Sequence, residues 1–257
     1  MRRAQARPTR IIAFGRLEMV LLLLAVTGLV ILGWVADPLL LAVVCALELL
    51  LAGFGGIALI GPARAERGIA RYLILPIAAV AVTLSGRLIA PSAIPFLVIG
   101  VVVAGIALWL VLRTELSWGA GERPKTAMDL VLATTLFAAS AGIPPVIGAE
   151  AWPPALIAVS LIGLVLGLRA AEARGATGGD ALGQATLHAV CVAELAAALP
   201  LLELPGAIAP AVLALGFYAW SGAADALLAG ASRRGVLVEF GLLGVLGIVV
   251  ALLVYGG

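Results

Sequence analysis

The chain carries little charge, one histidine, two cysteines and few aromatic residues. Charged residues make up 12% of its 257 residues and hydrophobic residues 63%, whereas about a quarter of an ordinary soluble domain is charged. So little polar surface cannot cover a water-soluble globule, and lipid must cover it instead. The basic residues are scattered over connections, with no basic face interleaved with aromatics, which argues against nucleic-acid binding.

The scarcity of histidine and cysteine bears on cofactors. A single histidine, His188, argues against a histidine-built metal site, a haem or an iron–sulfur cluster in this chain. Cys45 and Cys191 both lie inside apolar runs and have no ligand-like spacing, so they predict neither a disulfide nor a metal centre. We therefore expect this chain to hold no cofactor of its own.

Long apolar runs dominate the sequence. A helix needs about 20 apolar residues to cross the hydrocarbon core, and nine runs approach that length. The predicted fold class is an all-α, polytopic transmembrane helix bundle of about nine spans. The predicted spans are Met19–Val35, Pro38–Ile60, Tyr72–Ile89, Ile94–Leu112, Met128–Ile147, Pro154–Leu168, Ala185–Leu202, Ile208–Ala229 and Val236–Tyr255.

The cations fall in alternate connections, and of the 16 lysines and arginines only Arg87 breaks the pattern. The intervening connections carry Asp37, Glu150 and Glu203 and no cation. By the positive-inside rule the N-terminus lies in the cytoplasm and the C-terminus outside. The patterned cations are Arg2, Arg3, Arg7, Arg10, Arg16, Arg64, Arg67, Arg71, Arg113, Arg123, Lys125, Arg169, Arg174, Arg233 and Arg234.

Four segments follow from these spans: a cytoplasmic N-terminal segment (1–17), a first half of four spans (18–113), a linker loop with the fifth span (114–152), and a second half of four spans (153–257). Val44-Cys-Ala-Leu-Glu-Leu49 echoes Val190-Cys-Val-Ala-Glu-Leu195, which suggests an inverted repeat. The alternative is that any two helices rich in alanine, leucine and valine align tolerably.

Charged groups inside spans cost about 2.5–3.5 kcal/mol each on insertion scales, so they are functional candidates by default. For each acid the alternative is an inter-helix hydrogen bond in its protonated form; for the arginine it is snorkelling to the interface. Together they predict a chain of titratable groups for protons or cations. The candidates are Glu48, Arg87, His188, Glu194, Asp225 and Glu239.

Four further residues receive structural interpretations. Glu18 and Asp129 lie at helix starts and are interpreted as solvated charges. Pro144 and its neighbour Pro145 should break or kink the fifth span, and we favour a simple stop.

The stretch from the sixth to the eighth span resembles the small K subunit of bacterial complex I. The similar places are Gly163-Leu-Val165, then Arg169 and Arg174, then Cys191-Val-Ala-Glu194 and Gly222-Ala-Ala-Asp225-Ala226. The K subunit carries a Gly-Leu-Val motif, a basic loop and one buried glutamate in each of the next two helices.

Most of the chain is similar to the E component of group 4 membrane-bound nickel–iron hydrogenases, which contains a K-like unit. Cys45, Arg87-Leu-Ile-Ala-Pro91 and Ala224-Asp225-Ala226-Leu-Leu carry this likeness with the motif at Glu194. Three departures stand out: an aspartate is the second carboxylate, Arg87 replaces an intramembrane lysine, and the ninth span is additional. Because arginine does not release its proton, any titrating role at that place is in doubt.

The resemblance implies a non-redox membrane-arm subunit of a proton- or sodium-translocating oxidoreductase or hydrogenase in a bacterial or archaeal cytoplasmic (inner) membrane. Its partners would be antiporter-like subunits and subunits of a quinone or hydrogenase module, which hold iron–sulfur and NiFe centres. Glu194 and Asp225 would face each other's neighbourhood as proton-carrying acids. Glu48, His188 and Glu239 would support them, and Arg87 would set their proton affinities.

A stand-alone secondary transporter with inverted repeats is the alternative, and would purify alone and bind a small solute. A membrane-embedded enzyme ranks last, because the chain has no nucleophile, metal or phosphate motif.

Overall fold

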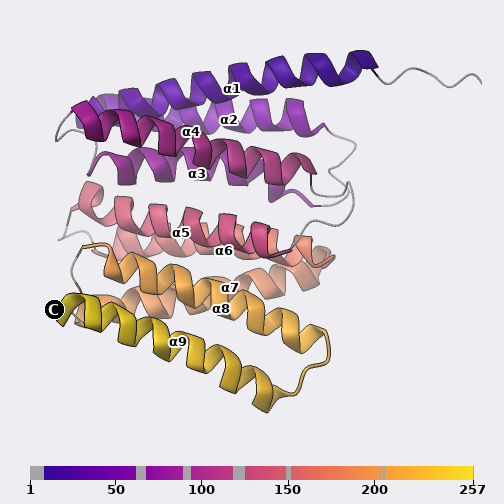
Figure 1. The fold of residues 1–257 in the computed structure, drawn as a ribbon, viewed down its shortest axis with the longest axis vertical. Helices are drawn as coiled ribbons and strands as arrows, with labels where there is room; N and C mark the ends of the chain where they lie inside the picture. The colour runs from indigo at the N-terminus through magenta and orange to yellow at the C-terminus, as the bar shows by residue number, and fades with distance from the viewer. Residues whose placement is uncertain are drawn as a thin grey trace, which may run out of the picture.

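The computed structural model describes residues 9–61, 68–88, 94–117, 125–148, 152–202, 204 and 206–256. The described residues form an all-α fold without strands, as predicted (Figure 1). Its elements are α1 (Thr9–Val35), α2 (Pro38–Ile60), α3 (Arg71–Gly86), α4 (Ile94–Ser117), α5 (Lys125–Ile147), α6 (Trp152–Ala173), α7 (Gly178–Ala198), a short 3₁₀ helix η4 (Leu199–Leu202), α8 (Ile208–Leu228) and α9 (Arg233–Gly256).

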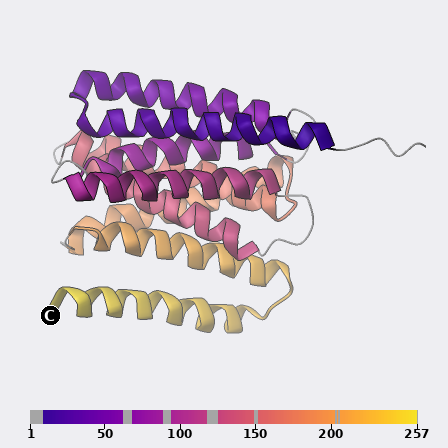
Figure 2. The same ribbon diagram turned by 45° about the horizontal axis from the view of Figure 1, so that its top comes forward.

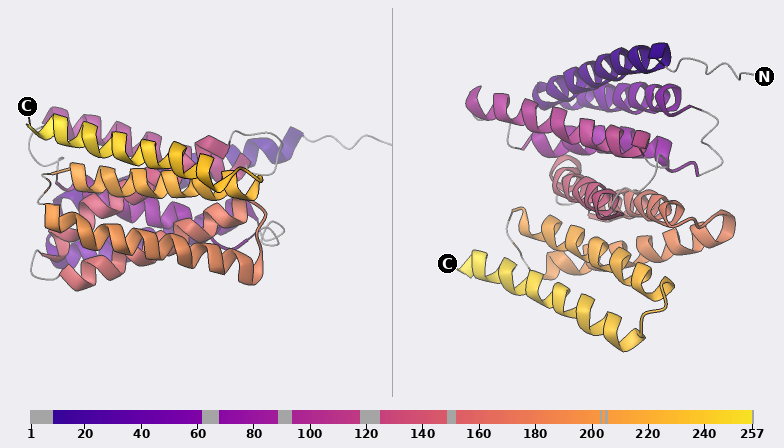
Figure 3. Two further views of the ribbon diagram at one scale, coloured as in Figure 1. Left: turned by 90° about the horizontal axis from the view of Figure 1, so that it is seen from below. Right: turned by 45° about the vertical axis from the view of Figure 1, so that its right-hand side comes forward.

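The helices lie side by side and alternate in direction, because each connection reverses the chain (Figures 1 and 2). Helices α1–α4 form one side of the stack, α5 and α6 the middle, and α7–α9 the other side. The start of α1 and the end of α9 lie at opposite ends of the bundle (Figure 3). We call the end where α1 begins the basic end; Arg71, Arg174 and Arg233 lie there.

Within the described residues, seven helices are long and apolar enough to cross a membrane: α1, α2, α4, α5, α6, α7 with η4, and α8. Helix α3, at 16 residues, is shorter. The protein is thus a multi-pass, all-helical membrane protein by length and composition. The count of nine spans and the orientation stay predictions.

Several helices extend beyond the predicted spans, and these extensions lie at the basic end. Helix α4 continues to Ser117 and α6 to Ala173, whereas α7 already begins at Gly178. Arg169, assigned to a loop by sequence, is therefore within a helix, and Arg71 is the first residue of α3. The reason is that charged residues continue a helix once their side chains find partners, so hydropathy marks the lipid boundary and not the helix end.

Helix α5 holds the two sides of the bundle together, since it packs against α3, α6 and α8. Its closest approach is at Gly142, where a Cβ atom would overlap the backbone of Leu84 and Ser85 in α3. Helix α5 ends at Ile147, the predicted end of the fifth span, but the chain stays helical through Pro144 and Pro145 and stops two residues after them. The two prolines have no N–H group, so the last turns of α5 lose only two backbone hydrogen bonds.

We expect Gly142→Ala to destabilise the protein, because the added methyl group meets backbone that cannot move aside. Overpacking of this kind costs about 1–3 kcal/mol. Gly105→Ala in α4 is the matched control, since nothing lies within 4 Å of the Cβ position there. Thermal unfolding of the purified variants in detergent measures the difference, and equal melting temperatures would contradict the tight α3–α5 contact.

Candidate functional site

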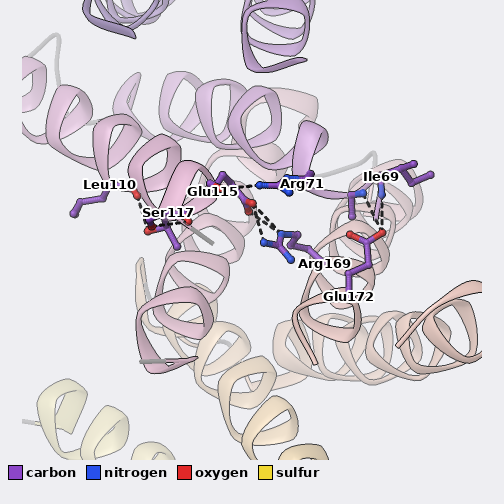
Figure 4. A network of polar contacts seen from close by, with 9 residues as sticks. Ile69, Arg71, Leu110, Glu115, Ser117, Arg169 and Glu172 are labelled. Carbon is purple, nitrogen blue, oxygen red and sulfur yellow. Dashed lines mark hydrogen bonds and ion pairs between the residues drawn. The ribbon is translucent and has the colours of Figure 1, made fainter. Parts of the chain in front are cut away.

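A buried ion cluster joins α3, α4 and α6 at the basic end (Figure 4). Arg169 donates from Nε and Nη2 to the two carboxylate oxygens of Glu115, at 2.8 Å each. Arg71 donates from Nη2 to the backbone carbonyl of Glu115 at 2.7 Å. All three residues are about 1% exposed. The planar guanidinium matches the carboxylate fork, which makes this the strongest type of side-chain ion pair.

Next to this cluster, α6 caps the start of α3. Glu172 Oε1 accepts hydrogen bonds from the backbone N–H groups of Ile69 (2.9 Å) and Ala70 (3.2 Å). These are donors that the first turn of a helix leaves unsatisfied. Gly68 precedes them with φ of 115°, and a Cβ atom there would overlap the Glu172 carboxylate. The site therefore requires glycine for both its conformation and its space.

A second polar chain runs from the basic end into the bundle between α6, α7 and α8. Arg174 pairs with Asp225 through Nε and donates to the side-chain oxygen of Gln184 (3.4 Å) and the backbone carbonyl of Ser221 (3.2 Å). Ser221 and Asp225 are four residues apart on α8 and so share a face. The chain ends at His188, whose Nε2 lies 3.2 Å from Ser221 Oγ.

The hydrogen bonds of His188 fix its neutral tautomer. Its Nδ1 lies 2.8 Å from the backbone carbonyl of Gln184, which can only accept, so Nδ1 carries the proton. In the neutral ring Nε2 then accepts from the Ser221 hydroxyl. The ring is 1% exposed and lies against Phe217 and Trp220. Gly167 on α6 leaves space for the His188 side chain, which a Cβ atom at that position would overlap.

The structure does not bring Glu194 and Asp225 together. Glu194 lies on an exposed face of α7, whereas Asp225 pairs with Arg174 and its side chain is 19% exposed. The sequence predicted Glu194 as the neighbour of Asp225. The structure places Arg174 there, a residue that the sequence analysis placed in a loop and used to orient the helices. The prediction that these two acids face each other inside the bundle is wrong for this chain alone.

Glu48 lies apart from both clusters, between α2 and α3, and is fully buried. Thr83 Oγ1 donates to its Oε1 at 2.5 Å, and its Oε2 has no hydrogen-bond partner among the described residues. Gly33 in α1 leaves the space that the Thr83 methyl group occupies. This is the inter-helix hydrogen bond that we gave as the structural alternative for each acid.

Arg87 stabilises the turn between α1 and α2. Its Nη1 donates to the backbone carbonyls of Gly33 and Ala36 at the end of α1, which satisfies carbonyls that the last turn leaves free. Asp37 caps the start of α2 by accepting from the backbone N–H of Leu40 at 2.9 Å. Among the ion pairs of the described residues, none joins Arg87 to Glu48.

Glu239 lines a cavity of about 310 Å³ between α5, α8 and α9, together with Asp129 and Tyr218. The interpretation of Asp129 as a solvated charge is wrong, because Asp129 is only 9% exposed. Glu18 is exposed, in line with a solvated charge, but it lies within α1, which begins at Thr9, and not at a helix start.

The repeated Val-Cys-x-x-Glu-Leu motif faces different ways in its two copies. Glu48 of the first copy is buried in α2, and Glu194 of the second is exposed on α7. The buried face of α7 passes instead through Ala185, His188 and Val192. The two copies therefore do not occupy equivalent places in the packing. Arg2, Arg64, Arg123, Glu150 and Glu203 lie outside the described residues.

Over the described ranges, no group of three or more histidine, cysteine, aspartate or glutamate side chains could hold a metal ion. Comparison of the chain with protein-family models, with curated proteins and with solved structures finds no match. The likeness to complex I and hydrogenase subunits thus depends on the short motifs alone.

Sequence reasoning missed Glu115, Glu172 and Ser221, and it assigned Arg169 to a loop although α6 includes it. Arg174 does lie in the connection after α6, but its pairing with Asp225 was not predicted. The sequence did contain a signal for the two missed acids. Glu115 and Glu172 each lie just beyond an apolar run, in connections that the topology prediction considered only for their arginines and lysines. The signal could not identify the partners of these acids, because the partners come from other helices.

We expect Glu115→Gln to destabilise the protein by about 3–5 kcal/mol, because it leaves the buried Arg169 guanidinium without its counter-charge. The double variant Glu115→Leu/Arg169→Leu should lose less than the sum of the two single leucine variants, because it leaves neither charge uncompensated. Glu18→Gln, an exposed acid, is the control. Unfolding in mixed micelles measures all five proteins, and strict additivity would contradict the pairing.

Thr83→Val tests the Glu48 contact. It keeps the shape of the side chain but removes the hydroxyl that bonds the buried carboxyl, so we expect a loss of about 1–3 kcal/mol. Thr134→Val is the control, because the Thr134 hydroxyl is exposed and bonds only its own helix. The same micelle unfolding measures both, and a loss no greater than that of the control would show that Glu48 does not depend on this hydroxyl.

Proposed function

We propose that this protein is a non-redox membrane-arm subunit of a complex I-like proton- or sodium-translocating oxidoreductase or hydrogenase. The observation that carries the proposal is the polar chain from Asp225 through Arg174, Gln184 and Ser221 to His188. It leads from the basic end of the bundle to a buried titratable ring, along the helices whose motifs resemble the complex I K subunit.

The chemistry of this polar chain suits proton transfer. The Ser221 hydroxyl lies next to Nε2 of His188 and can pass a proton to it. A proton needs a bridging water between Asp225 and this hydroxyl, because Arg174 bonds the backbone carbonyl of Ser221 and not its hydroxyl. Arg174 stays charged and does not release its proton, so it serves as a fixed cation that holds Asp225 and Gln184 in place. His188 lies ten residues from the start of α7, about 15 Å along the helix axis at 1.5 Å per residue.

The exposed Glu194 supports a subunit over a stand-alone transporter. Its α7 neighbours Leu187 and Val190 are exposed apolar side chains, so the carboxyl group belongs to a surface that lipid tails would cover. A charge at that depth costs about 2.5–3.5 kcal/mol, which a polar group of a neighbouring membrane subunit would offset. Glu194 would then meet the proton path across an interface between chains, and not within this one.

Under this proposal, redox chemistry belongs to partner chains. Hydrophilic partners would hold iron–sulfur clusters and, in a hydrogenase, a NiFe centre. Antiporter-like membrane subunits would flank this chain in the cytoplasmic membrane of a bacterium or archaeon. Mass spectrometry of the chains that copurify with this protein from native membranes tests the assignment. A protein that purifies alone and transports a solute would support the transporter instead.

We expect His188→Gln and Asp225→Asn to lower ion translocation per electron by about ten-fold or more, because each removes a proton-carrying group. Electron transfer should change much less, since it takes place elsewhere. Acidification of native membrane vesicles, divided by the rate of electron transfer, measures this ratio. Asp180→Asn, an exposed acid in the first turn of α7, is the control. Variants that assemble and keep the parental ratio would overturn the proton path.

A further inference from the structure

A largely apolar cavity of about 390 Å³ lies at the end of the bundle opposite the basic end. It is formed by the last turns of α5 and α7 and the first turns of α6 and α8, inside four of the helices that can cross a membrane. Among the described residues that line it, Ser140 has the one polar side chain and none is charged. Its volume is within the range of sites that hold small organic molecules.

Prolines give this cavity its polar character. In a helix each carbonyl accepts from the N–H four residues later, and proline has no N–H. Pro144, Pro145 and Pro200 therefore remove the normal donors of the carbonyls of Ser140, Ala141 and Ala196. All three of these carbonyl-bearing residues line the cavity.

Two hydrogen-bond donors at the same place are already used. The Ser140 hydroxyl donates to its own helix, at 2.8 Å from the Leu136 carbonyl oxygen, and the N–H of Gly148 donates to Pro144 at 3.0 Å. The cavity thus combines these carbonyl acceptors with an apolar wall, and its further donors are the first-turn N–H groups of α6 and α8, which have no acceptor within their own helix.

We propose that this cavity binds a lipophilic molecule with a hydroxyl headgroup, such as a long-chain alcohol, whose O–H group donates to the carbonyls of Ala141 and Ala196. The apolar wall takes up the chain, and the freed carbonyls recognise the donor. The inference does not depend on the proposed function, since none of its residues belongs to the polar chain of His188.

The test uses the full-length protein in phosphatidylcholine nanodiscs with a photoreactive dodecanol, and with its methyl ether as the matched probe without a donor. Labelled peptides are mapped by mass spectrometry. We expect the alcohol to label the ends of α5 and α7 about five-fold more strongly than the ether at equal concentration, the factor that one net hydrogen bond provides.

Two variants separate filling of the cavity from recognition of the donor. Ala196→Leu should abolish labelling by both probes, because the larger side chain occupies the cavity. Pro200→Ala restores an N–H that can bond the Ala196 carbonyl, so the preference for alcohol over ether should fall while labelling persists. Ala127→Leu, at the exposed start of α5, is the control for an added side chain.

Equal labelling by alcohol and ether in the parent protein would overturn the proposal and identify a site for plain lipid tails. Labelling confined to other helices would overturn it as well. If Ala196→Leu does not fold, Leu156→Trp on α6 fills the same cavity from the opposite wall.

Discussion

The ion pair between Arg169 and Glu115 is the interaction on which the rest of the bundle depends. It joins α6 to α4, and through the Glu115 carbonyl it reaches Arg71 at the start of α3. One turn further along α6, Glu172 supplies the cap that α3 lacks. The first four helices and the remaining five thus meet through a few buried charges at one end and through the α3–α5 contact in the middle. Such a pair adds little net stability over an apolar contact, but breaking it is costly.

The sequence predicts the ends of a helix well only where a proline, a glycine or a capping residue marks them. Helix α2 begins and ends where predicted, because Asp37 and Pro38 mark its start and Gly61 its end. No breaker follows Leu168 in α6, so the apolar run stops there while the helix continues through Arg169 to Ala173. Hydropathy describes what contacts lipid, and the polar clusters lie just beyond that limit.

The candidate site is predicted in its residue types and not in its partners. Asp225 and His188 do belong to one polar chain, but Arg174 stands where Glu194 was expected. Two copies of the same motif turn Glu48 inward and Glu194 outward. The sequence does not predict this difference, because both helices are apolar on all sides. Without an amphipathic pattern, sequence does not tell which face of a helix meets protein and which meets lipid. That choice is made by close contacts such as those of Gly33 and Gly167.

The buried pair at the basic end also constrains biogenesis. Glu115 and Arg169 are 54 positions apart, so during synthesis α4 emerges well before the helix that neutralises it. The start of α3 waits longer still for its cap, because Ile69 and Glu172 are 103 positions apart. The nascent chain must hold Glu115 near the membrane surface, beside the earlier Arg71, until α6 arrives. A ribosome that stalls before α6 would leave four helices with an unsatisfied carboxylate and an uncapped start, a state that quality-control proteases can recognise.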